Sequence, residues 1–385
     1  MPAFESAEFQ SRLTAVKKIM EKNGVEALFV IDQPNICWVT GYEGNSAYVP
    51  QGMLVTLADA EPVMILREMD IPCATATTWL SEKSLLNYDE RILGLGEAVI
   101  WKSIGEIIRS RTQTRKLAFE RGAAGLSFDN YNALVAALGL EKPVDASGWL
   151  NAARAVKSPA ELRYMSEAAE IVDHALSCGI AEIKVGAREC DVGATILSKL
   201  ASGTPTAPGG APHSTVTMPV GPFSSAPHLN WSDKRYELNS QTNFEVGAFR
   251  HRYCSALSRT VFLGKPSERL RHIDATVRGA FEATVPELKS GGRCMDAYAA
   301  FWKAFSPHGV RKESRIGYGI GIDWTEGSYS LQRDDERVLL RDSTVHLIIG
   351  IWEKHEGYVF SETFRITDKG GVSFSRMPRK LFVND

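Results

Sequence analysis

One stretch of the sequence decides the fold: FEVGAFRHRYCSALSRTVFLGKP, residues 244–266. Its apolar segments, 244–249 and 253–264, have the length and composition of buried strands. Glu245 stands between two apolar residues in the first segment, and Arg259 stands within the second. We expect Arg259 to be structural, anchoring neighbouring backbone or carboxylates. The elements predicted downstream are helices at about 266–289 and 294–308 and strands at 345–352, 358–367 and 370–375.

Upstream of this stretch lies a specific helix start. Ser158 can cap the helix, Pro159 takes the first helical position and Glu161 completes a capping box. The elements predicted next are helices from 159 to about 184 and from about 189 to 201, and a Gly- and Pro-rich loop at 202–225 with an extended segment at 215–219. Two strand-rich halves with two helices each would fit a duplicated domain.

The first 150 residues alternate between strand and helix patterns. The predicted helices are 4–23, 98–110 and 128–139, and the predicted strands are 27–31, 53–58, 62–66 and 116–120, with 53–58 and 62–66 as a hairpin and a turn at 32–35. Such alternation is typical of a small α/β domain. We therefore expect two domains, residues 1–150 and 151–385.

Composition narrows the class of protein. The 385 residues carry a net charge of −2, which argues against a nucleic-acid binder and a polybasic membrane-surface protein. No apolar run approaches a membrane span, and residues 1–24 show no secretory h-region. Six cysteines without a CxxC pair indicate reduced thiols and exclude zinc fingers. We expect a cytoplasmic enzyme for a small molecule, with neither nucleic acid nor membrane as partner.

Five short strings in order resemble the pita-bread family of creatinase, prolidase and aminopeptidase P, the M24-type family. They are KSPAEL (157–162), APHLNW (226–231), the stretch 244–266, GYGIGID (317–323) and SETFRIT (361–367). The resemblance covers the whole chain. It implies an α/β (α+β) fold, with a creatinase-like N-terminal domain (1–150) and a pita-bread catalytic domain (151–385).

The metal ligands of the family's peptidases are largely replaced. In those peptidases two aspartates, a histidine and two glutamates hold two metal ions. The corresponding positions here are Glu245, Ala256, Tyr318, either Ile349 or Gly350, and Glu362, the one carboxylate retained. Divalent cations need about six hard ligands, and a dinuclear site needs bridging carboxylates. We therefore predict no catalytic metal and no cofactor.

Among metal-free branches, the ectoine hydrolases resemble this sequence most. The matching strings include FEVG (244–247), RHRY (250–253) and GYGIG (317–321), whereas the segment after it, 322–327, is shorter here. The resemblance implies metal-independent hydrolysis of a C–N bond in a small zwitterionic amidine-like compound, with ectoine giving N-acetyl-2,4-diaminobutyrate. The alternatives are a creatinase-like amidinohydrolase, an Xaa-Pro-type dipeptidase homologue and an inactive pita-bread binding module.

Four residues are candidates for the chemistry. Glu245 would be the nucleophile, because a carboxylate facing an amidinium stays ionised and can form a covalent adduct. His228 would be the general acid and base, and in a creatinase-like enzyme it would carry the hydrolysis. Tyr318 and Glu362 would position the substrate. The alternatives are a surface strand residue for Glu245, a loop histidine for His228 and a cavity filler for Tyr318.

Aromatic side chains supply the candidate substrate-binding residues. A delocalised cation over an aromatic ring gains roughly 0.5–2 kcal/mol. The set comprises Trp38, Tyr42 and Tyr48 in an N-terminal loop, and His346, Trp324 and Trp352 in the C-terminal domain. A histidine in so apolar a strand as that of His346 is more often a core residue. In relatives the N-terminal segment reaches the site of the other subunit, so the resemblance implies a homodimer with shared sites.

Overall fold

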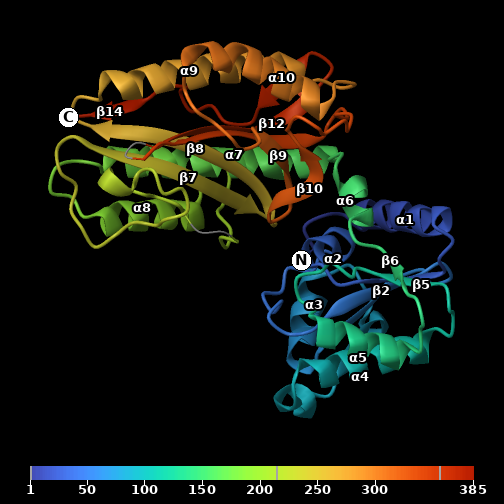
Figure 1. The fold of residues 1–385 in the computed structure, drawn as a ribbon. Helices are drawn as coiled ribbons and strands as arrows, with labels where there is room; N and C mark the ends of the chain where they lie inside the picture. Colours follow the sequence, from blue (N-terminus) through green and yellow to red (C-terminus); the bar gives the residue numbers. More distant parts are fainter. Residues whose placement is uncertain (1, 214–215, 355–356) are drawn as a thin grey trace. The chain divides into compact units, whose positions relative to one another are not determined.

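The computed structural model describes residues 2–213, 216–354 and 357–385, and it divides into two compact units. Unit 1 is Met1–Arg154 and unit 2 is Ala155–Asp385. Figure 1 shows both as mixtures of helix and strand, and each is described by itself. None of the helices in these ranges is both long and apolar enough to cross a membrane.

Unit 1 is a sheet with helices packed on it. Its helices are α1 (Ser6–Lys22), α2 (Gln33–Thr40), α3 (Ile71–Thr77), α4 (Glu97–Arg111), α5 (Phe128–Leu138) and α6 (Trp149–Arg154). Its strands are β1 (Ala27–Val30), β2 (Gly52–Thr56), β3 (Val63–Arg67), β4 (Leu85–Tyr88), β5 (Leu117–Phe119) and β6 (Val144–Asp145). The strand order is β4-β3-β2-β1-β5-β6, and the predicted hairpin is confirmed as the antiparallel pair β2 and β3.

The turn predicted at residues 32–35 of unit 1 is wrong. Residues 32–35 do not form a free turn but begin helix α2, with Pro34 in its first turn. A proline is tolerated there because the first helical N–H groups have no partner within the helix. The buried carboxylate of Glu120 accepts hydrogen bonds from the N–H groups of Ile31 and Asp32, both at 2.8 Å. This contact from the residue that follows β5 fixes the start of α2.

Unit 2 contains the longer strands. Its helices are α7 (Pro159–Ala181), α8 (Glu189–Ser202), α9 (Glu268–Thr284) and α10 (Cys294–Phe305). Its strands are β7 (Ser240–Arg250), β8 (Tyr253–Leu263), β9 (Gly317–Gly321), β10 (Trp324–Ser330), β11 (Thr344–Trp352), β12 (Gly357–Thr367), β13 (Gly370–Ser373) and β14 (Phe382–Asn384). The sheet has the order β10-β9-β11-β12-β8-β14, with β7 paired to β8 and β13 to β12.

The helix ends of unit 2 follow from local chemistry. The predicted capping box is confirmed: Ser158 Oγ accepts from the N–H of Glu161 at 3.3 Å, and Glu161 Oε2 accepts from the N–H of Ser158 at 2.7 Å. Helices α9 and α10 end earlier than predicted, at Thr284 and Phe305. Pro286 and Pro307 follow closely, and a proline cannot continue the hydrogen-bond ladder of a helix.

The two helix pairs cover the same face of the unit 2 sheet. Helices α7 and α8 pack on β7 and β8, whereas α9 and α10 pack on β11 and β12 (Figure 1). Alternate residues of each strand point to opposite faces. Residues such as Phe244, Leu257 and Leu347 enter the helix-covered cores. Their neighbours along each strand therefore point to the opposite side, which we call the inner face.

Candidate active site on the inner face

A row of residues crosses four strands on the inner face. Glu245 of β7 pairs with Ser258 of β8, Ser258 pairs with Ser361 of β12, and Ser361 pairs with Ile348 of β11. Directly paired residues in antiparallel strands point to the same side of the sheet. The register therefore places one carboxylate beside two hydroxyl groups and an apolar side chain.

The carboxylate of Glu245 is desolvated, and no residue in the described part of the chain gives it a hydrogen bond or an ion pair. The side chain is half-buried, and burial raises the pKa of its carboxyl group to about 7. The backbone of Glu245 is fixed by two hydrogen bonds of 3.1 Å with Thr217. Since burial disfavours the charged form, a cation placed beside Glu245 would be bound well and would restore its negative charge.

Two serines that the sequence reasoning missed stand next to Glu245. Ser258 and Ser361 are fully buried, and their hydroxyl groups find no partner among the described residues. A buried hydroxyl without a hydrogen bond is costly, so such groups are typical of places where a ligand or water completes the contact. Strand alternation could have indicated both serines, but only with the pairing register known.

Trp324 and Tyr318 form one boundary of the site next to this row. Trp324 Nε1 donates to Tyr318 Oη at 3.0 Å, and the Trp324 ring lies so close over Gly247 that a Cβ there would approach it to 2.3 Å. Burial, together with the charge of Glu245, raises the pKa of Tyr318 to about 12. Tyr318 therefore stays protonated and can serve as a hydrogen-bond donor near Glu245.

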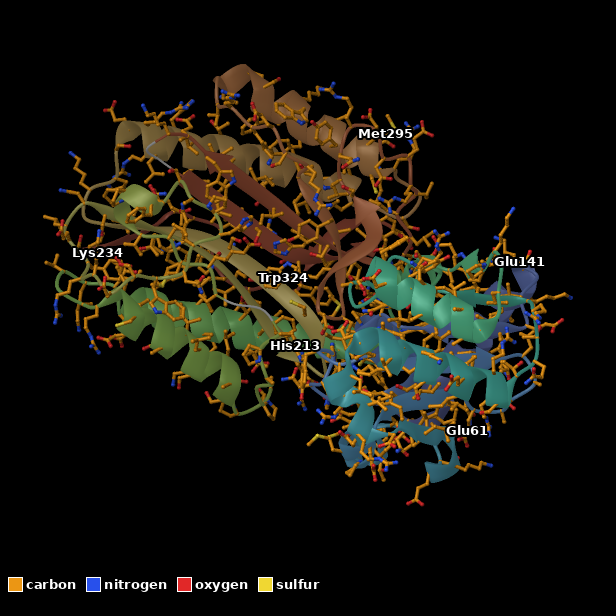
Figure 2. The ribbon with its side chains drawn as sticks, turned by 60° about the horizontal axis from the view of Figure 1, so that its bottom comes forward. Glu61, Glu141, His213, Lys234, Met295 and Trp324 are labelled. Atoms are coloured by element: carbon orange, nitrogen blue, oxygen red, sulfur yellow. The ribbon has the colours of Figure 1, made fainter. Side chains whose placement is uncertain are left out.

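The turn that presents Trp324 is strained. Asp323 and Trp324 have φ angles of 59° and 85°, in the left-handed region that favours glycine. Arg252 holds the turn, because its Nε donates to Asp323 Oδ1 at 3.0 Å. Figure 2 shows His213 near Trp324, and His213 Nδ1 lies 3.8 Å from Asp323 Oδ1. Strain held by surrounding contacts is common at functional sites. His213 stands in no pattern of the sequence that could have indicated its place near the site.

His346 also points to the inner face, although it is fully buried. Its ring centroid lies 5.5 Å from that of Tyr318 and 5.9 Å from that of Trp324. Its Nδ1 lies 3.5 Å from Thr363 Oγ1, and its Nε2 has no partner within the described ranges. Burial lowers the pKa of His346 to about 3, so the imidazole is neutral at physiological pH. The structure thus places His346 beside the site as a neutral group.

His228 lies in an exposed loop near the edge of β7. The N–H of Met218 donates to the carbonyl of Leu229 at 2.9 Å, and the adjacent Thr217 pairs with Glu245. The extended segment that contains Thr217 and Met218 therefore lies between the His228 loop and the strand of Glu245. That segment was predicted at 215–219; the described part forms bridges at Thr217 and Val220, and 214–215 lie outside the described residues.

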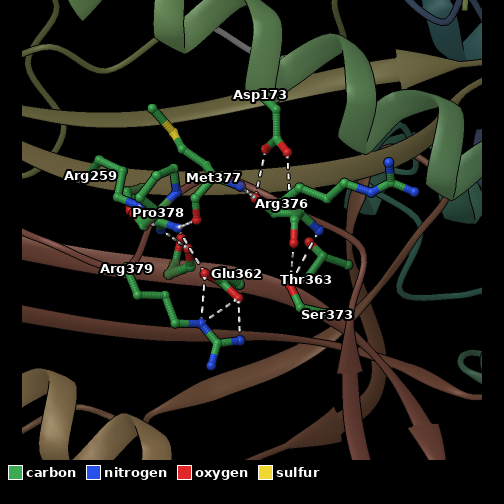
Figure 3. Close-up of polar contacts among 12 residues, drawn as sticks. Asp173, Arg259, Glu362, Thr363, Ser373, Arg376, Met377, Pro378 and Arg379 are labelled. Atoms are coloured by element: carbon green, nitrogen blue, oxygen red, sulfur yellow. Dashed lines mark hydrogen bonds and ion pairs between the residues drawn. The ribbon is translucent and has the colours of Figure 1, made fainter.

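Glu362 lies elsewhere, on the helix-covered face. It follows Ser361 in β12 and so points away from Glu245. Its carboxylate is fully buried and accepts from Arg259 Nη2 at 2.8 Å and from Arg379 Nη2 at 2.7 Å (Figure 3). The structure therefore does not bring Glu362 together with Glu245, His228 or Tyr318.

The hydrogen bonds of Arg259 confirm the structural role that was expected for it. Besides Glu362, it donates to the carbonyl groups of Ser361 at 2.9 Å and of Met377 at 3.1 Å. It thereby joins β8, β12 and the C-terminal segment (Figure 3).

The aromatic candidates divide by environment. Trp38 lies in helix α2 rather than in a loop, and the Arg12 guanidinium already covers its ring at 5.6 Å. Tyr42 is buried, with its hydroxyl 3.1 Å from Ser46 Oγ. Tyr48 is 73% exposed, and its hydroxyl accepts from Arg67 Nη1 at 3.4 Å. Trp352, at the end of β11, lines a cavity of unit 2.

The donor set of the inner face does not suit a metal pair. Glu245 is the carboxylate there, whereas Ala256, Gly350 and Ile348 offer no side-chain ligand. Of the two positions considered for a first glutamate, Ile349 lies in the helix-covered core and Gly350 on the inner face. Within the described ranges, no three His, Cys, Asp or Glu side chains form a group that could hold a metal ion.

This fold and inner-face site define the class of two-domain pita-bread proteins, and the predicted fold class is confirmed. The chain belongs to the metallopeptidase family M24, a family of hydrolases. Residues 163–368 match that family, and residues 12–156 match the creatinase/prolidase N-terminal domain.

Individual relatives extend over nearly the whole chain. An uncharacterized hydrolase/peptidase of Sinorhizobium fredii is 35% identical, over 99% of this chain and 97% of that protein. The ectoine hydrolase of Halomonas elongata is 30% identical, over 99% of this chain and 98% of that protein. The prolidase structure from Pyrococcus horikoshii OT3 has a TM-score of 0.82 at 21% identity, covering 96% of this chain and 99% of that one.

The family's peptidases use metal, and the described inner-face residues of this chain do not fit such a site. A lone carboxylate and a buried neutral imidazole cannot bridge and charge-balance two divalent ions. No step of the chemistry below is therefore routed through a metal.

The Glu362 contacts predict a loss of stability on substitution. Glu362→Gln leaves the buried Arg259 without its counter-charge, and removing one partner of a buried pair costs about 3 kcal/mol or more. Urea unfolding measures the change in the free energy of unfolding. The exposed Glu237→Gln is the matched control, expected within about 0.5 kcal/mol of the parent. Unchanged stability of Glu362→Gln would contradict the structural role.

Proposed function

We propose that this protein is a metal-independent hydrolase of a C–N bond in a small zwitterionic amidine-like compound, with ectoine as the leading substrate. The observation that carries the proposal is Glu245, a desolvated carboxylate beside two hydroxyl groups that have no partner among the residues described, at a place where metal ligands would be expected. Such a carboxylate favours a cationic ligand. The 30% identity to an ectoine hydrolase supports the same chemistry.

The reaction can be written with the groups of this site. One oxygen of Glu245 forms a bond to the amidinium carbon, and one C–N bond breaks. The departing nitrogen takes a proton from His228, which gives a free amine. Water, deprotonated by His228, then attacks the same carbon and releases the carboxylate of Glu245. One water is consumed, and an amide and an amine are formed.

The other groups would support the charge that develops. Tyr318 is protonated and close enough to Glu245 for its pKa to respond to the carboxylate. It can donate a hydrogen bond to the substrate or to the adduct. The hydroxyl groups of Ser258 and Ser361, next to Glu245 in the row, can hold the attacking water. Trp324 keeps Tyr318 in place through its hydrogen bond.

A substrate screen and one variant test the proposal together. We expect ring opening of ectoine, and of 5-hydroxyectoine if its hydroxyl is accepted, with N-acetyl-2,4-diaminobutyrate as the product of ectoine. Glu245→Gln should abolish turnover without loss of stability, because none of the described residues forms a hydrogen bond or ion pair with the carboxylate that the variant would lose. Turnover is followed by chromatography, with Glu237→Gln as control. Near-normal turnover of Glu245→Gln would move the chemistry to His228.

The same screen separates the alternatives. Hydrolysis of creatine but not of ectoine would indicate the creatinase-like amidinohydrolase. Cleavage of proline dipeptides would indicate the dipeptidase homologue, and no turnover of any of these compounds would indicate a binding module.

The pH profile follows from the same carboxylate. The pKa of Glu245 is raised to about 7, so its nucleophilic, ionised form is populated above that pH and is lost below it. Hence kcat/KM should rise with pH through about 7, since it reports the free enzyme. A profile that stays flat down to pH 5 would contradict ionised Glu245 as the attacking group.

Metal independence gives a separate prediction. The purified protein should hold less than one equivalent of Mn, Fe, Co or Zn per chain by elemental analysis. Its turnover should survive dialysis against a chelator, because the inner-face residues that the structure describes do not form a set of metal ligands. Stoichiometric metal together with chelator-sensitive turnover would show that metal takes part.

We also propose a homodimer, as the family resemblance implies. Tyr48 is exposed and is the aromatic of its segment that could meet a ligand in a partner's site. Sedimentation equilibrium should give twice the mass of one chain. A mass of one chain at micromolar concentration would contradict shared sites.

A further inference from the structure

A buried ion pair joins the first residues of unit 2 to strand β10. Lys157 Nζ donates to Glu326 Oε2 at 2.6 Å, and both side chains are 1% exposed. Lys157 immediately precedes the capping box of α7, and Glu326 lies two residues after Trp324. The reaction proposed above uses neither residue. Since the desolvation of two charges offsets much of their attraction, stability alone is a weak reason for such a pair.

The ammonium group of Lys157 is fixed by the backbone around it. The N–H of Lys157 donates to the carbonyl of Asp342 at 3.0 Å, in the segment that leads into β11. Its Nζ donates a second hydrogen bond to the carbonyl of Ala155 at 3.2 Å. Lys157 can therefore hold the carboxylate of Glu326 in one position.

The other oxygen of Glu326 reaches the strained turn before β10. Glu326 Oε1 accepts from the N–H of Ile322 at 3.2 Å, and a Cβ at Gly321 would collide with the same oxygen. The turn that follows contains Asp323 and Trp324, both with positive φ angles. Residues other than glycine keep such angles only where surrounding contacts hold them. The carboxylate of Glu326 is one of those contacts.

The guanidinium of Arg252 is the second contact that holds the turn. It binds the carboxylate of Asp323, from the connection between β7 and β8. Trp324 therefore follows a residue held by Arg252 and precedes, by two positions, a residue held by Lys157. Together the two contacts determine where the indole ring of Trp324 lies.

The indole ring carries the position of the turn into the site. Trp324 Nε1 donates to Tyr318 Oη at 3.0 Å, and the ring lies over Gly247, which is two residues from Glu245 on the same face. A hydroxyl that accepts one hydrogen bond must direct its own proton elsewhere. The hydrogen bond from Trp324 thus sets the directions in which Tyr318 can donate, and a displaced turn would change them.

We propose that Lys157 and Glu326 are positioning residues of the site, which act on Tyr318 through the turn and Trp324. They act through other residues and not on the substrate itself. The inference rests on the proposed function for the step that Tyr318 supports, whereas the placement of Trp324 can be measured without turnover. It also gives a role to the lysine of KSPAEL (157–162), which takes no part in the capping box.

The placement of Trp324 is measured on the protein without substrate. The eight tryptophans are labelled with 15N, and the indole signal of Trp324 is assigned by its loss in Trp324→Phe. Glu326→Gln offers one acceptor oxygen to the two donors that the carboxylate serves, so one of the two hydrogen bonds is lost. The signal of Trp324 should shift, and exchange of its N–H with water should become roughly tenfold faster.

Kinetics test whether this placement matters for the reaction. In Glu326→Gln and in Lys157→Met, kcat should fall roughly ten- to hundredfold with a smaller change in KM, because Tyr318 is misdirected. Lys157→Arg keeps the cation and should restore most of kcat. Leu270→Ala, in the core between α9 and the sheet, is the matched control. It should lower the melting temperature but leave the Trp324 signal and kcat unchanged.

The outcomes separate this inference from the proposed function. A shifted Trp324 signal in Glu326→Gln, with no turnover of any compound by the parent, would reject the proposed function and keep the placement of Trp324 by the pair. An unchanged signal in Glu326→Gln, or an unchanged kcat where the parent hydrolyses ectoine, would overturn this inference alone. If Leu270→Ala shifts the signal as far as Glu326→Gln does, the pair acts only through overall stability, and the inference is also overturned.

Discussion

The buried ion pair between Arg259 and Glu362 fixes the geometry on which the site depends. Arg259 lies in β8 and Glu362 in β12, and both are almost fully shielded from water. Arg259 also holds the carbonyl of Ser361, so strand spacing and strand register are set together. Because the pair occupies the helix-covered face, the adjacent Ser258 and Ser361 must turn to the inner face. The hydroxyl groups of Ser258 and Ser361 thus lie beside Glu245 because the ion pair of the neighbouring residues lies on the opposite face of the sheet.

Local chemistry allowed much of the fold to be predicted from the sequence. The capping box at Ser158, the apolar strands and the turn-rich connections each carry their own signal. The start of α2 was mistaken for a turn, since its stabilising contact comes from Glu120, far along the chain. Contacts of that kind leave no trace in a local pattern.

The site was harder to predict because it depends on register. A shift of one residue along a strand moves a side chain to the opposite face. Glu362 and Ser361 differ by that one position, and the sequence offered no means of choosing which faces Glu245.

The contact of Trp324 with Gly247 has a consequence for how the protein forms. It joins β10 to β7, which lie at remote positions in the sequence and on different branches of the sheet. Contacts of large sequence separation lose the most chain entropy and tend to be completed late in folding. The contact between Trp324 and Gly247 would then form last, after both helix-covered cores. A partly folded chain would therefore contain the two cores before it contains a complete site.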